Sequence, residues 1–414
     1  MSNQKEKRQP EVNIGVVGHV DHGKTTLVQA LTGIWTARHS EELKRAMTIK
    51  LGYADGDIYE CEDLPPPDRF KTEPNCGKPI YKRSVSYVDA PGHEVLMATM
   101  LSGAALMDGA ILVIAANEPC PQPQTREHFA ALEIVGVKHL VVVQNKVDVV
   151  TKEQALKNYE QIKKFLEGTW AENAPIIPVS ALHKVNIDAL VMAIEKYIPT
   201  PERNLSADPL MFIVRSFDVN KPGTSPNELV GGIVGGSLLR GILRVGDEIE
   251  IKPGIKVIKG KTGEAYEPLT SEVTSIRFGT REFKEARPGG LVAIGTKLDP
   301  SLTKADKLVG NVLGKAGTLP DPSYDLTIEY KLMERVIGTK ELLRVRPLMK
   351  GERIMITAGS AVSLGLITKL SKDVLEVRLR KPVVAWEGMR VAISRQVLGR
   401  WRLVGWGVIK GFTE

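Results

Sequence analysis

The segment from Gly18 to Thr25 has the residue types and spacing of a loop that binds the phosphates of a nucleotide. It reads Gly-His-Val-Asp-His-Gly-Lys-Thr, follows an apolar run and precedes a helical stretch. Glycines let backbone N–H groups wrap a phosphate, and the N-terminus of the following helix adds the positive end of its dipole. Lys24 would reach the β- and γ-phosphate oxygens, and the Thr25 hydroxyl would be a ligand of Mg²⁺. In this loop the predicted phosphate-binding residues are Asp21, His22, Gly23, Lys24, Thr25 and Thr26.

Two further segments supply candidates for contact with the metal and the γ-phosphate. The motif Asp89-Ala-Pro-Gly-His follows the strand pattern Val85 to Val88. An aspartate at the end of a parallel strand can hold Mg²⁺ through a water, and the N–H of Gly92 can sense the γ-phosphate. Thr48 lies between the two motifs and would complete the Mg²⁺ coordination only when the γ-phosphate is present. We therefore predict a loop that acts as a switch.

The motif Asn145-Lys146-Val147-Asp148 indicates that the base is guanine. Asp148 offers two carboxylate oxygens to the two donors on the Watson–Crick edge of guanine, which adenine cannot match. Lys146 can lay its aliphatic stem on the base, and Asn145 can tie this loop to the phosphate loop. The last strand pattern ends in Ser180-Ala181-Leu182, whose N–H groups would contact guanine O6. Together the motifs select GTP over ATP, because adenine would leave these groups unpaired. The predicted cofactors are GTP or GDP with Mg²⁺.

These motifs lie in a region, Val12 to about Ile198, where buried-strand patterns alternate with helical patterns. The expected strands are Val12–Val17, Val85–Asp89, Ala110–Ala115, Leu140–Gln144 and Ile176–Val179. The expected helices are Thr25–Thr32, Glu94–Leu106, Gln124–Ile134, Lys152–Glu167 and Ile187–Tyr197. This alternation predicts βαβ units, a mostly parallel sheet with helices on both faces, and ligands at the carboxyl ends of the strands.

The rest of the chain is predicted to be all-β. Short alternating runs are separated there by Gly and Pro, and helical patterns nearly vanish. Closely spaced strands favour closed barrels, because closure removes exposed edges, and about 200 residues suit two barrels of ordinary domain size. We therefore predict a multidomain α/β plus all-β protein. Its parts are a flexible N-terminus at 1–10, a GTP-binding domain at 11–200, a linker at 201–209, and β-barrels at 210–321 and 322–414.

One stretch of the first domain breaks the alternating pattern. Residues 53–82 are rich in Pro, Asp and Glu, and we expect them to form an irregular, mobile insertion. Two of the three cysteines, Cys61 and Cys76, fall in this stretch, and the third is Cys120. Three cysteines are too few for a disulfide framework and fit a reducing compartment.

Composition restricts the functional class. The chain has 414 residues, its longest apolar runs are too short to span a bilayer, and its N-terminus lacks the apolar core of a signal peptide. We expect a cytoplasmic protein with no membrane partner. The net charge of +7 fits either an anionic partner or a solvated lysine-rich surface. Basic residues concentrate in the last third, which favours a nearby phosphate backbone. They are Arg378, Arg380, Lys381, Arg390, Arg395, Arg400 and Arg402.

The motifs of the first domain resemble those of the translational GTPases. The segments Gly18–Thr26 and Asp89–His93 have the form seen in elongation factor Tu and its relatives. A narrower resemblance is to the family of gamma subunits of archaeal and eukaryotic translation initiation factor 2. It rests on Asn13–Gln29, His39–Arg45 with Met47–Gly52, Asp89–Gln124 and Arg215–Thr224, and it extends from about Pro10 to the segment Gly399–Gly407.

The resemblance implies a protein-synthesizing GTPase that is slow without an activating partner, with a GTP-binding domain and two β-barrels. It implies that the GTP form binds methionylated initiator tRNA and delivers it to the small ribosomal subunit, in a heterotrimer with alpha and beta subunits. It also implies that His93 is catalytic, and an imidazole beside the γ-phosphate sensor can indeed hydrogen-bond the attacking water. Asp21 and a backbone carbonyl near Ala46 are further candidates for a cation site.

Two features depart from the family pattern. Ala46 stands where the family has glycine, which reduces the backbone freedom of the switch loop. The family commonly carries two cysteine pairs that form a zinc knuckle at 53–82, whereas only Cys61 and Cys76 remain here. Structural zinc takes four nitrogen or sulfur ligands, so we expect no bound zinc.

Two other functions share this architecture. One is an elongation-type carrier of aminoacyl-tRNA, general or selenocysteine-specific, although the selenocysteine factor would need an additional C-terminal RNA-binding domain for which the chain has no room. The other is the GTPase subunit of sulfate adenylyltransferase, which works with a metabolic enzyme. The long stretch before Asp89 and the segment Leu101–Gln124 favour the initiation factor.

Overall fold

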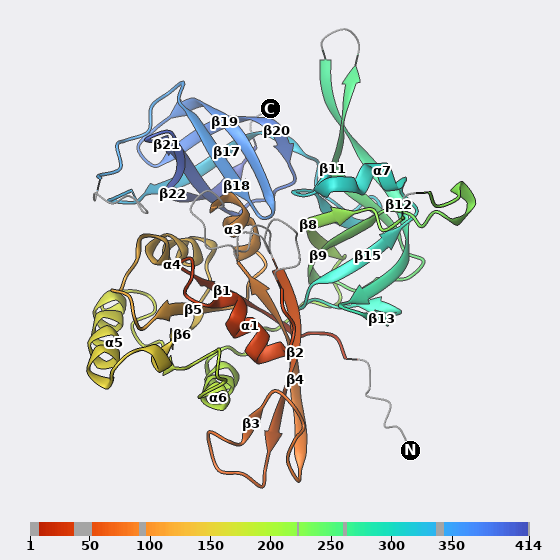
Figure 1. Cartoon of the computed structure of the whole chain (residues 1–414). Helices are drawn as coiled ribbons and strands as arrows, with labels where there is room; N and C mark the ends of the chain where they lie inside the picture. The colour runs from red at the N-terminus through yellow and green to blue at the C-terminus, as the bar shows by residue number, and fades with distance from the viewer. Residues whose placement is uncertain are drawn as a thin grey trace.

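The computed structural model describes residues 8–36, 52–90, 97–221, 223–259, 263–336 and 343–412. A GTP-binding domain of sheet and helices comes first, and two β-barrels follow it (Figure 1). The predicted fold class, an α/β domain with a mostly parallel sheet followed by two β-barrels, is confirmed.

The central sheet of the GTP-binding domain has the strand order β3-β2-β4-β1-β5-β6-β7. Strands β4, β1, β5, β6 and β7 run parallel, whereas β2 and β3 join as an antiparallel edge. All residues of β1 and β5 are buried, as expected for central strands covered on both faces. The strands are β1 (Val12–Gly18), β2 (Gly52–Cys61), β3 (Phe70–Lys71), β4 (Pro79–Asp89), β5 (Gly109–Ala115), β6 (His139–Asn145) and β7 (Ile176–Pro178).

Helices cover both faces of this sheet, and alternate strand residues point to opposite sides. Leu27 of α1 and Leu190 of α6 pack on one face with Val16 and Val141. Helices α3, α4 and α5 pack on the other face. The helices are α1 (Lys24–Thr32), α3 (Met97–Ala104), α4 (Pro123–Val135), α5 (Lys152–Leu166) and α6 (Ile187–Tyr197), with a short 3-10 turn, η2 (Val147–Val149).

The stretch 53–82, which we expected to be irregular, is largely a β-hairpin. Strand β2 pairs antiparallel with β4 from Gly52↔Asp89 to Cys61↔Pro79, and this pairing extends the sheet of the GTP-binding domain. The hairpin is anchored from outside its own strands as well, because Lys71 forms an ion pair of 2.6 Å with Asp188 of α6. The prediction was wrong because Pro, Asp and Glu are concentrated in the turn region 62–78, while the flanking strands satisfy their backbone groups by pairing.

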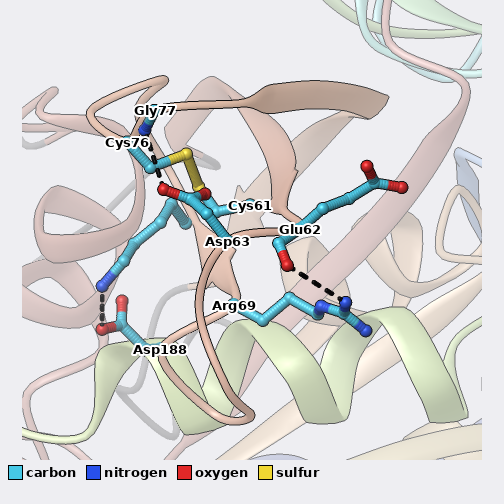
Figure 2. The surroundings of a disulfide bond; sticks show 8 residues. Cys61, Glu62, Asp63, Arg69, Cys76, Gly77 and Asp188 are labelled. Carbon is cyan, nitrogen blue, oxygen red and sulfur yellow. Dashed lines mark hydrogen bonds and ion pairs between the residues drawn. A yellow bond between two sulfur atoms is a disulfide. The ribbon is translucent and has the colours of Figure 1, made fainter.

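Cys61 and Cys76 form a disulfide across the end of this hairpin (Figure 2). The strand end and the returning loop bring their Cα atoms to 6.1 Å, within the range that a disulfide spans. A cysteine count excludes a framework of several bridges and says nothing about a single one. The expectation of no disulfide framework therefore did not foresee this single bridge.

The first barrel closes through six strands. The order β11-β16-β8-β9-β15-β12 returns to β11 through an antiparallel β11–β12 pairing, and β13 extends β12. Its strands are β8 (Leu210–Phe217), β9 (Ile233–Arg240), β11 (Glu248–Lys259), β12 (Gly263–Phe278), β13 (Arg281–Phe283), β15 (Val292–Thr296) and β16 (Val312–Lys315). Shorter elements are β10 (Leu243–Arg244), β14 (Glu285–Ala286), α7 (Pro300–Thr303), η3 (Pro226–Glu228) and η4 (Lys304–Asp306).

The second barrel is closed by the order β17-β20-β19-β18-β21-β22. Its core is continuous with the apolar residues of α3 and α4, whereas the core of the first barrel is separate. Figure 1 shows α3 and α4 lying between this barrel and the sheet of the GTP-binding domain. Its strands are β17 (Ser323–Leu332), β18 (Arg353–Ala358), β19 (Ala361–Leu370), β20 (Val374–Val383), β21 (Arg390–Val397) and β22 (Arg400–Gly411).

Part of the N-terminal segment 1–10, which we expected to be flexible, is held by the fold. The guanidinium of Arg8 lies 3.7 Å from the centre of the Tyr81 ring, and Gln9 accepts a hydrogen bond of 3.1 Å from the N–H of Arg287. The segment therefore links the hairpin to the first barrel. Within the part of the chain that the structure describes, no helix is both long and apolar enough to cross a membrane.

Candidate guanine-nucleotide site

The phosphate loop connects the end of β1 to α1, as the sequence predicts. Gly23 adopts a left-handed conformation, φ 88°, at the N-terminus of α1, and a Cβ there would lie 2.4 Å from Nδ2 of Asn145. Only glycine combines this backbone with such a close neighbour. Asp21 also has a positive φ of 60° and is exposed, while Thr25 and Thr26 lie in the first turn of the helix. The loop thus presents its backbone at a helix N-terminus, a site that favours an anion.

Lys24 is the first residue of α1, and its side chain is buried against the phosphate loop. Its Nζ donates to the carbonyl of His19 at 2.6 Å. Burial lowers the pKa of Lys24 to about 8, against the opposing pull of Asp89 and Asp21. The carboxylates of Asp89 and Asp21 only partly offset the cost of burying this positive charge. A bound phosphate would supply further negative charge beside it, so the position favours an anionic ligand.

His22 serves the loop as a neutral, internal side chain. Its Nδ1 lies 3.1 Å from the carbonyl oxygen of Val113, and its Nε2 lies 3.2 Å from a carboxylate oxygen of Glu118. Burial is the largest effect on its pKa and lowers it to about 4, although both contacts oppose the shift. The His22 imidazole therefore ties the loop to β5, and a phosphate contact from this residue would come from its backbone.

Thr25 and Asp89, the predicted magnesium residues, meet at the edge of the sheet. The Thr25 hydroxyl donates to Oδ2 of Asp89 at 2.7 Å, and Thr36 donates to the same oxygen at 2.6 Å. Hydroxyl and carboxylate oxygens are the hard ligands that Mg²⁺ takes, usually together with waters and substrate phosphates. This pair beside the phosphate loop fits that ion. Thr36 was not predicted, because a lone threonine after a helix carries no motif.

Asn145 joins three loops of the site. Its Nδ2 donates to the carbonyl of His22 at 2.9 Å, and its Oδ1 accepts from the N–H of Ala181 at 3.0 Å. The side chain is buried, so both hydrogen bonds are sheltered from water. The predicted tie between the guanine and phosphate loops is present, and it also includes the loop after β7.

The remaining guanine-loop residues surround Asp148. Lys146 takes a positive φ of 63°, and Val147 starts the 3-10 turn that carries Asp148. A hydrogen bond from Ser180 and the nearby His183 hold the pKa of the Asp148 carboxyl below its usual value. Leu182 lies beside them and is 72% exposed. The carboxylate is therefore ionised and available to a base with two adjacent donors.

Four predicted site residues lie outside the described part of the chain: Ala46, Thr48, Gly92 and His93. Sequence analysis also missed two residues of α4 that hold the phosphate loop. Nδ1 of His128 accepts from the N–H of Gly18 at 2.9 Å, and Oε1 of Gln124 accepts from the N–H of Val20 at 3.1 Å. No local pattern marks them, because the contacts join residues more than 100 positions apart.

Comparisons with known proteins agree with this geometry. Residues 9–200 match the model of the elongation factor Tu GTP binding domain, and residues 324–409 match that of initiation factor eIF2 gamma, C terminal. The translation initiation factor 2 subunit gamma of Aeropyrum pernix is 63% identical over 98% of this chain and 99% of its own length. The protein of the same name from Archaeoglobus fulgidus is 58% identical over 97% and 95%. A crystal structure of the bacterial selenocysteine-specific elongation factor EF-Sec superposes with a TM-score of 0.74 at 25% identity, covering 97% of this chain and 58% of that one.

The fold and the site define a translational GTPase that uses GTP and GDP with Mg²⁺. The identity over nearly the whole length of the archaeal proteins settles the family. The chain belongs to the gamma subunits of translation initiation factor 2 and acts in translation initiation. This assignment replaces the two alternatives, an elongation-type carrier and the GTPase subunit of sulfate adenylyltransferase.

Proposed function

We propose that the GTP form of this chain binds methionylated initiator tRNA, delivers it to the small ribosomal subunit and leaves after GTP hydrolysis. We further propose that it works in the cytoplasm as a heterotrimer with alpha and beta subunits. The membership in the initiation factor family supports this proposal. The observation that carries it within the structure is a cavity between the GTP-binding domain and the first barrel, described below.

In the nucleotide site, the N–H groups from Asp21 to Thr26 and the Lys24 ammonium would hold the phosphates, with Gly92 sensing the γ-phosphate. The base would lie between Lys146 and the Ser180–Leu182 loop, with Asp148 on its Watson–Crick edge. Mg²⁺ would be held by Thr25, Thr48 and, through water, Asp89, with Asp21 and the Ala46 carbonyl as further candidates. The ion would neutralise charge on the phosphate oxygens.

His93 is the proposed catalytic residue. It follows the γ-phosphate sensor directly in the chain, where an imidazole can orient the attacking water. We expect His93→Ala to reduce ribosome-stimulated hydrolysis at least tenfold while GTP affinity stays within about twofold of wild type. Single-turnover hydrolysis together with GTP titration would separate the two effects. A large loss of affinity with unchanged turnover of bound GTP would mean that His93 is structural.

The cavity between the GTP-binding domain and the first barrel fits the esterified end of a charged tRNA. It measures about 460 Å³ and is lined by Tyr53 of β2 and by apolar and basic residues of the barrel. These barrel residues include Arg215, Phe217, Arg277, Phe278, Arg281, Leu291 and Val292. The apolar residues of this lining suit the unbranched methionine side chain, and its arginines suit the terminal phosphates.

This cavity also offers a route by which nucleotide could control tRNA. Thr48 stands only five residues before Tyr53 in the chain, and Tyr53 lines the cavity. A γ-phosphate that orders the Thr48 loop would therefore act on the segment leading into the cavity wall. Methionine burial of this kind contributes about 1.5–3 kcal/mol, so deacylated tRNA should bind at least tenfold more weakly.

The basic C-terminal third offers fewer phosphate contacts than its arginine count suggests. Arg395 forms a bidentate ion pair with Glu352, Arg390 donates to carbonyls at the end of α4, and Arg402 is buried against Glu127. Arg378 and Arg380 remain exposed on β20, and the partner of Arg378 is a carboxylate oxygen of Asp325 at the long distance of 3.9 Å. We therefore assign the salt-dependent contacts with the acceptor stem to this strand.

Two variants separate the cavity from the phosphate contacts. Ala293→Leu adds volume to the cavity lining and should lower affinity for charged initiator tRNA to that of the deacylated form. Arg378→Gln should weaken charged and deacylated tRNA equally and reduce the salt dependence, because phosphates carry no information about methionine. Filter binding with a GTP analogue would measure both, with charged elongator tRNA as the competitor. Equal affinity for initiator and elongator tRNA would contradict the initiator-specific carrier.

A further inference from the structure

Helix α4 contacts two parts of the molecule that are far apart in sequence. One side faces the phosphate loop, where His128 and Gln124, one turn apart, accept the N–H groups of Gly18 and Val20. The residue just before His128, Glu127, faces the second barrel. Because successive residues of a helix are rotated by about 100°, adjacent positions can serve two neighbours at once.

The contact with the second barrel is a buried ion pair. Nη1 of Arg402, on β22, donates to Oε1 of Glu127 at 2.5 Å. The two residues are 7% and 2% exposed, so the pair is removed from water. Breaking one member of a buried pair leaves an uncompensated charge, which is costly. The barrel therefore cannot move away from α4 without exposing or unpairing this carboxylate.

A second contact from the same barrel holds the end of α4. Nη1 of Arg390 donates to the carbonyls of Glu133 and Ile134, each at 3.3 Å. These are carbonyls of the last helical turn, where a cation is favoured by the helix dipole. The apolar cores of α4 and the barrel are also continuous. The helix is thus held by the barrel at its middle and at its carboxyl end.

The contacts on the other side of α4 set the backbone of the phosphate loop. His128 is buried, and burial lowers its pKa to about 3, so its ring is neutral over the physiological range. Because Nδ1 accepts a hydrogen bond, the ring proton is on Nε2. Gly18 is the last residue of β1 and has a positive φ of 141°. A Cβ added to Gly18 would lie 2.3 Å from the carbonyl oxygen of Val113, so the backbone of Gly18 is closely packed against β5. The helix therefore binds the N–H groups of Gly18 and Val20, and phosphate would be bound by the later N–H groups of the loop.

We propose that His128 and Gln124 are positioning residues of the phosphate loop, and that the Arg402–Glu127 pair couples them to the second barrel. Nucleotide release is then set in part by how this barrel docks on α4. A partner that draws the barrel away from α4 would loosen the loop and speed the release of GDP. This inference rests on the proposed role of the phosphate loop, and it adds a control that lies outside the nucleotide site.

The first test is the dissociation rate of a fluorescent GDP analogue from the full chain. His128→Leu removes the acceptor and should speed dissociation about tenfold, the scale of one buried hydrogen bond lost at the site. His128→Asn keeps an acceptor near the position of Nδ1 and should stay within about twofold of wild type. If both variants show the same rate at matched thermal stability, His128 acts only as a packing residue and the proposal is overturned.

The second test measures the coupling. Arg402→Gln should speed GDP dissociation about three- to fivefold, and Lys410→Gln, on the same strand but in an exposed pair with Glu329, should leave the rate unchanged. In the His128→Leu background, Arg402→Gln should have little further effect, because the loop has already lost its contact. Multiplicative effects would contradict coupling through α4. If Arg402→Gln does not fold, Glu127→Gln gives the same comparison.

A separate variant distinguishes failure of this inference from failure of the nucleotide-site assignment. Lys24→Ala should abolish tight GDP binding whatever the role of α4. If Lys24→Ala leaves GDP affinity unchanged, the phosphate-loop assignment itself is wrong. If Lys24→Ala abolishes binding while the α4 variants leave dissociation unchanged, only the coupling is excluded.

Discussion

Replacing Asn145 with alanine should weaken nucleotide binding although this side chain need not touch the nucleotide. The substitution removes the hydrogen bonds to the His22 carbonyl at 2.9 Å and from the Ala181 N–H at 3.0 Å. Both partners belong to loops that we assign to the nucleotide, and both hydrogen bonds are buried. The three loops would then lose their common anchor.

The size of the effect follows from these two hydrogen bonds. A buried partner left without its hydrogen bond costs about 1–3 kcal/mol, so the two together cost about 2–6 kcal/mol. Nucleotide binding would then have to bring the three loops back into their original arrangement, and part of the cost would fall on the binding free energy. If about 2–3 kcal/mol of this cost falls on binding, the dissociation constant for GDP should rise roughly 30- to 150-fold. Isothermal titration calorimetry with GDP measures this directly.

Asn311 provides a matched control for loss of stability. It is fully buried in the first barrel, donates to the Leu308 carbonyl and accepts from the Gly254 N–H. Asn311→Ala should therefore lower the thermal transition while GDP affinity stays within about twofold of wild type. If Asn145→Ala behaves in the same way, with lower stability and unchanged affinity, the idea that Asn145 organises the nucleotide loops is refuted.

Three other predictions concern the base, the pH dependence and the disulfide. Asp148→Asn should weaken GTP by about 2–3 kcal/mol and improve the binding of xanthine nucleotide, and titration with both nucleotides would show unchanged affinities if the base is read elsewhere. Since the pKa of Lys24 is about 8 and a bound phosphate would raise it, GDP binding should take up a proton above pH 8 and weaken as pH rises; calorimetry in buffers of different ionisation enthalpy that finds no proton uptake would contradict the assignment. In the absence of nucleotide, the pKa of Lys24 lies below its unfolded value of 10.5, so its contribution to the stability of the fold becomes more favourable as pH rises through this window. Cys76→Ser should destabilise the hairpin by up to about 3 kcal/mol, the scale for a loop of this length, and make residues 62–78 easier to cleave by protease, whereas Cys120→Ser should behave like wild type.

The sequence was sufficient to predict the parts of the fold that are governed by local patterns. Helix α6 begins and ends at the predicted residues, α1 and α5 differ from prediction by one residue at one end, and α4 is longer by one residue at each end. Buried apolar runs identified the central strands, because a strand covered on both faces buries nearly all of its side chains and these are mostly apolar. The phosphate and guanine motifs were found for a similar reason, since each is a short segment with its own chemistry.

The features that the sequence did not reveal depend on contacts between distant residues. The hairpin at 53–82 was hidden by a turn rich in Pro and acidic residues, and its strands pair only across that turn, from Cys61↔Pro79 to Gly52↔Asp89. Thr36 meets Asp89 and His128 meets Gly18 only after the sheet has formed. The sequence predicted that Arg390, Arg395 and Arg402 face nucleic acid, whereas in the structure they bind carboxylate and carbonyl groups of the chain itself. Residue type alone cannot distinguish a solvated arginine from a buried one.

The measurement that bears most directly on the proposed function is the affinity for initiator tRNA in each nucleotide state. Charged and deacylated initiator tRNA would be titrated with the chain bound to GDP or to a non-hydrolysable GTP analogue, with and without the alpha subunit. We expect the charged tRNA with the GTP analogue to bind at least tenfold more tightly than either deacylated tRNA with the analogue or charged tRNA with GDP. The affinity should also fall log-linearly with salt. Equal affinity across these conditions would leave only a basic protein that binds RNA without control by GTP, and would contradict the carrier.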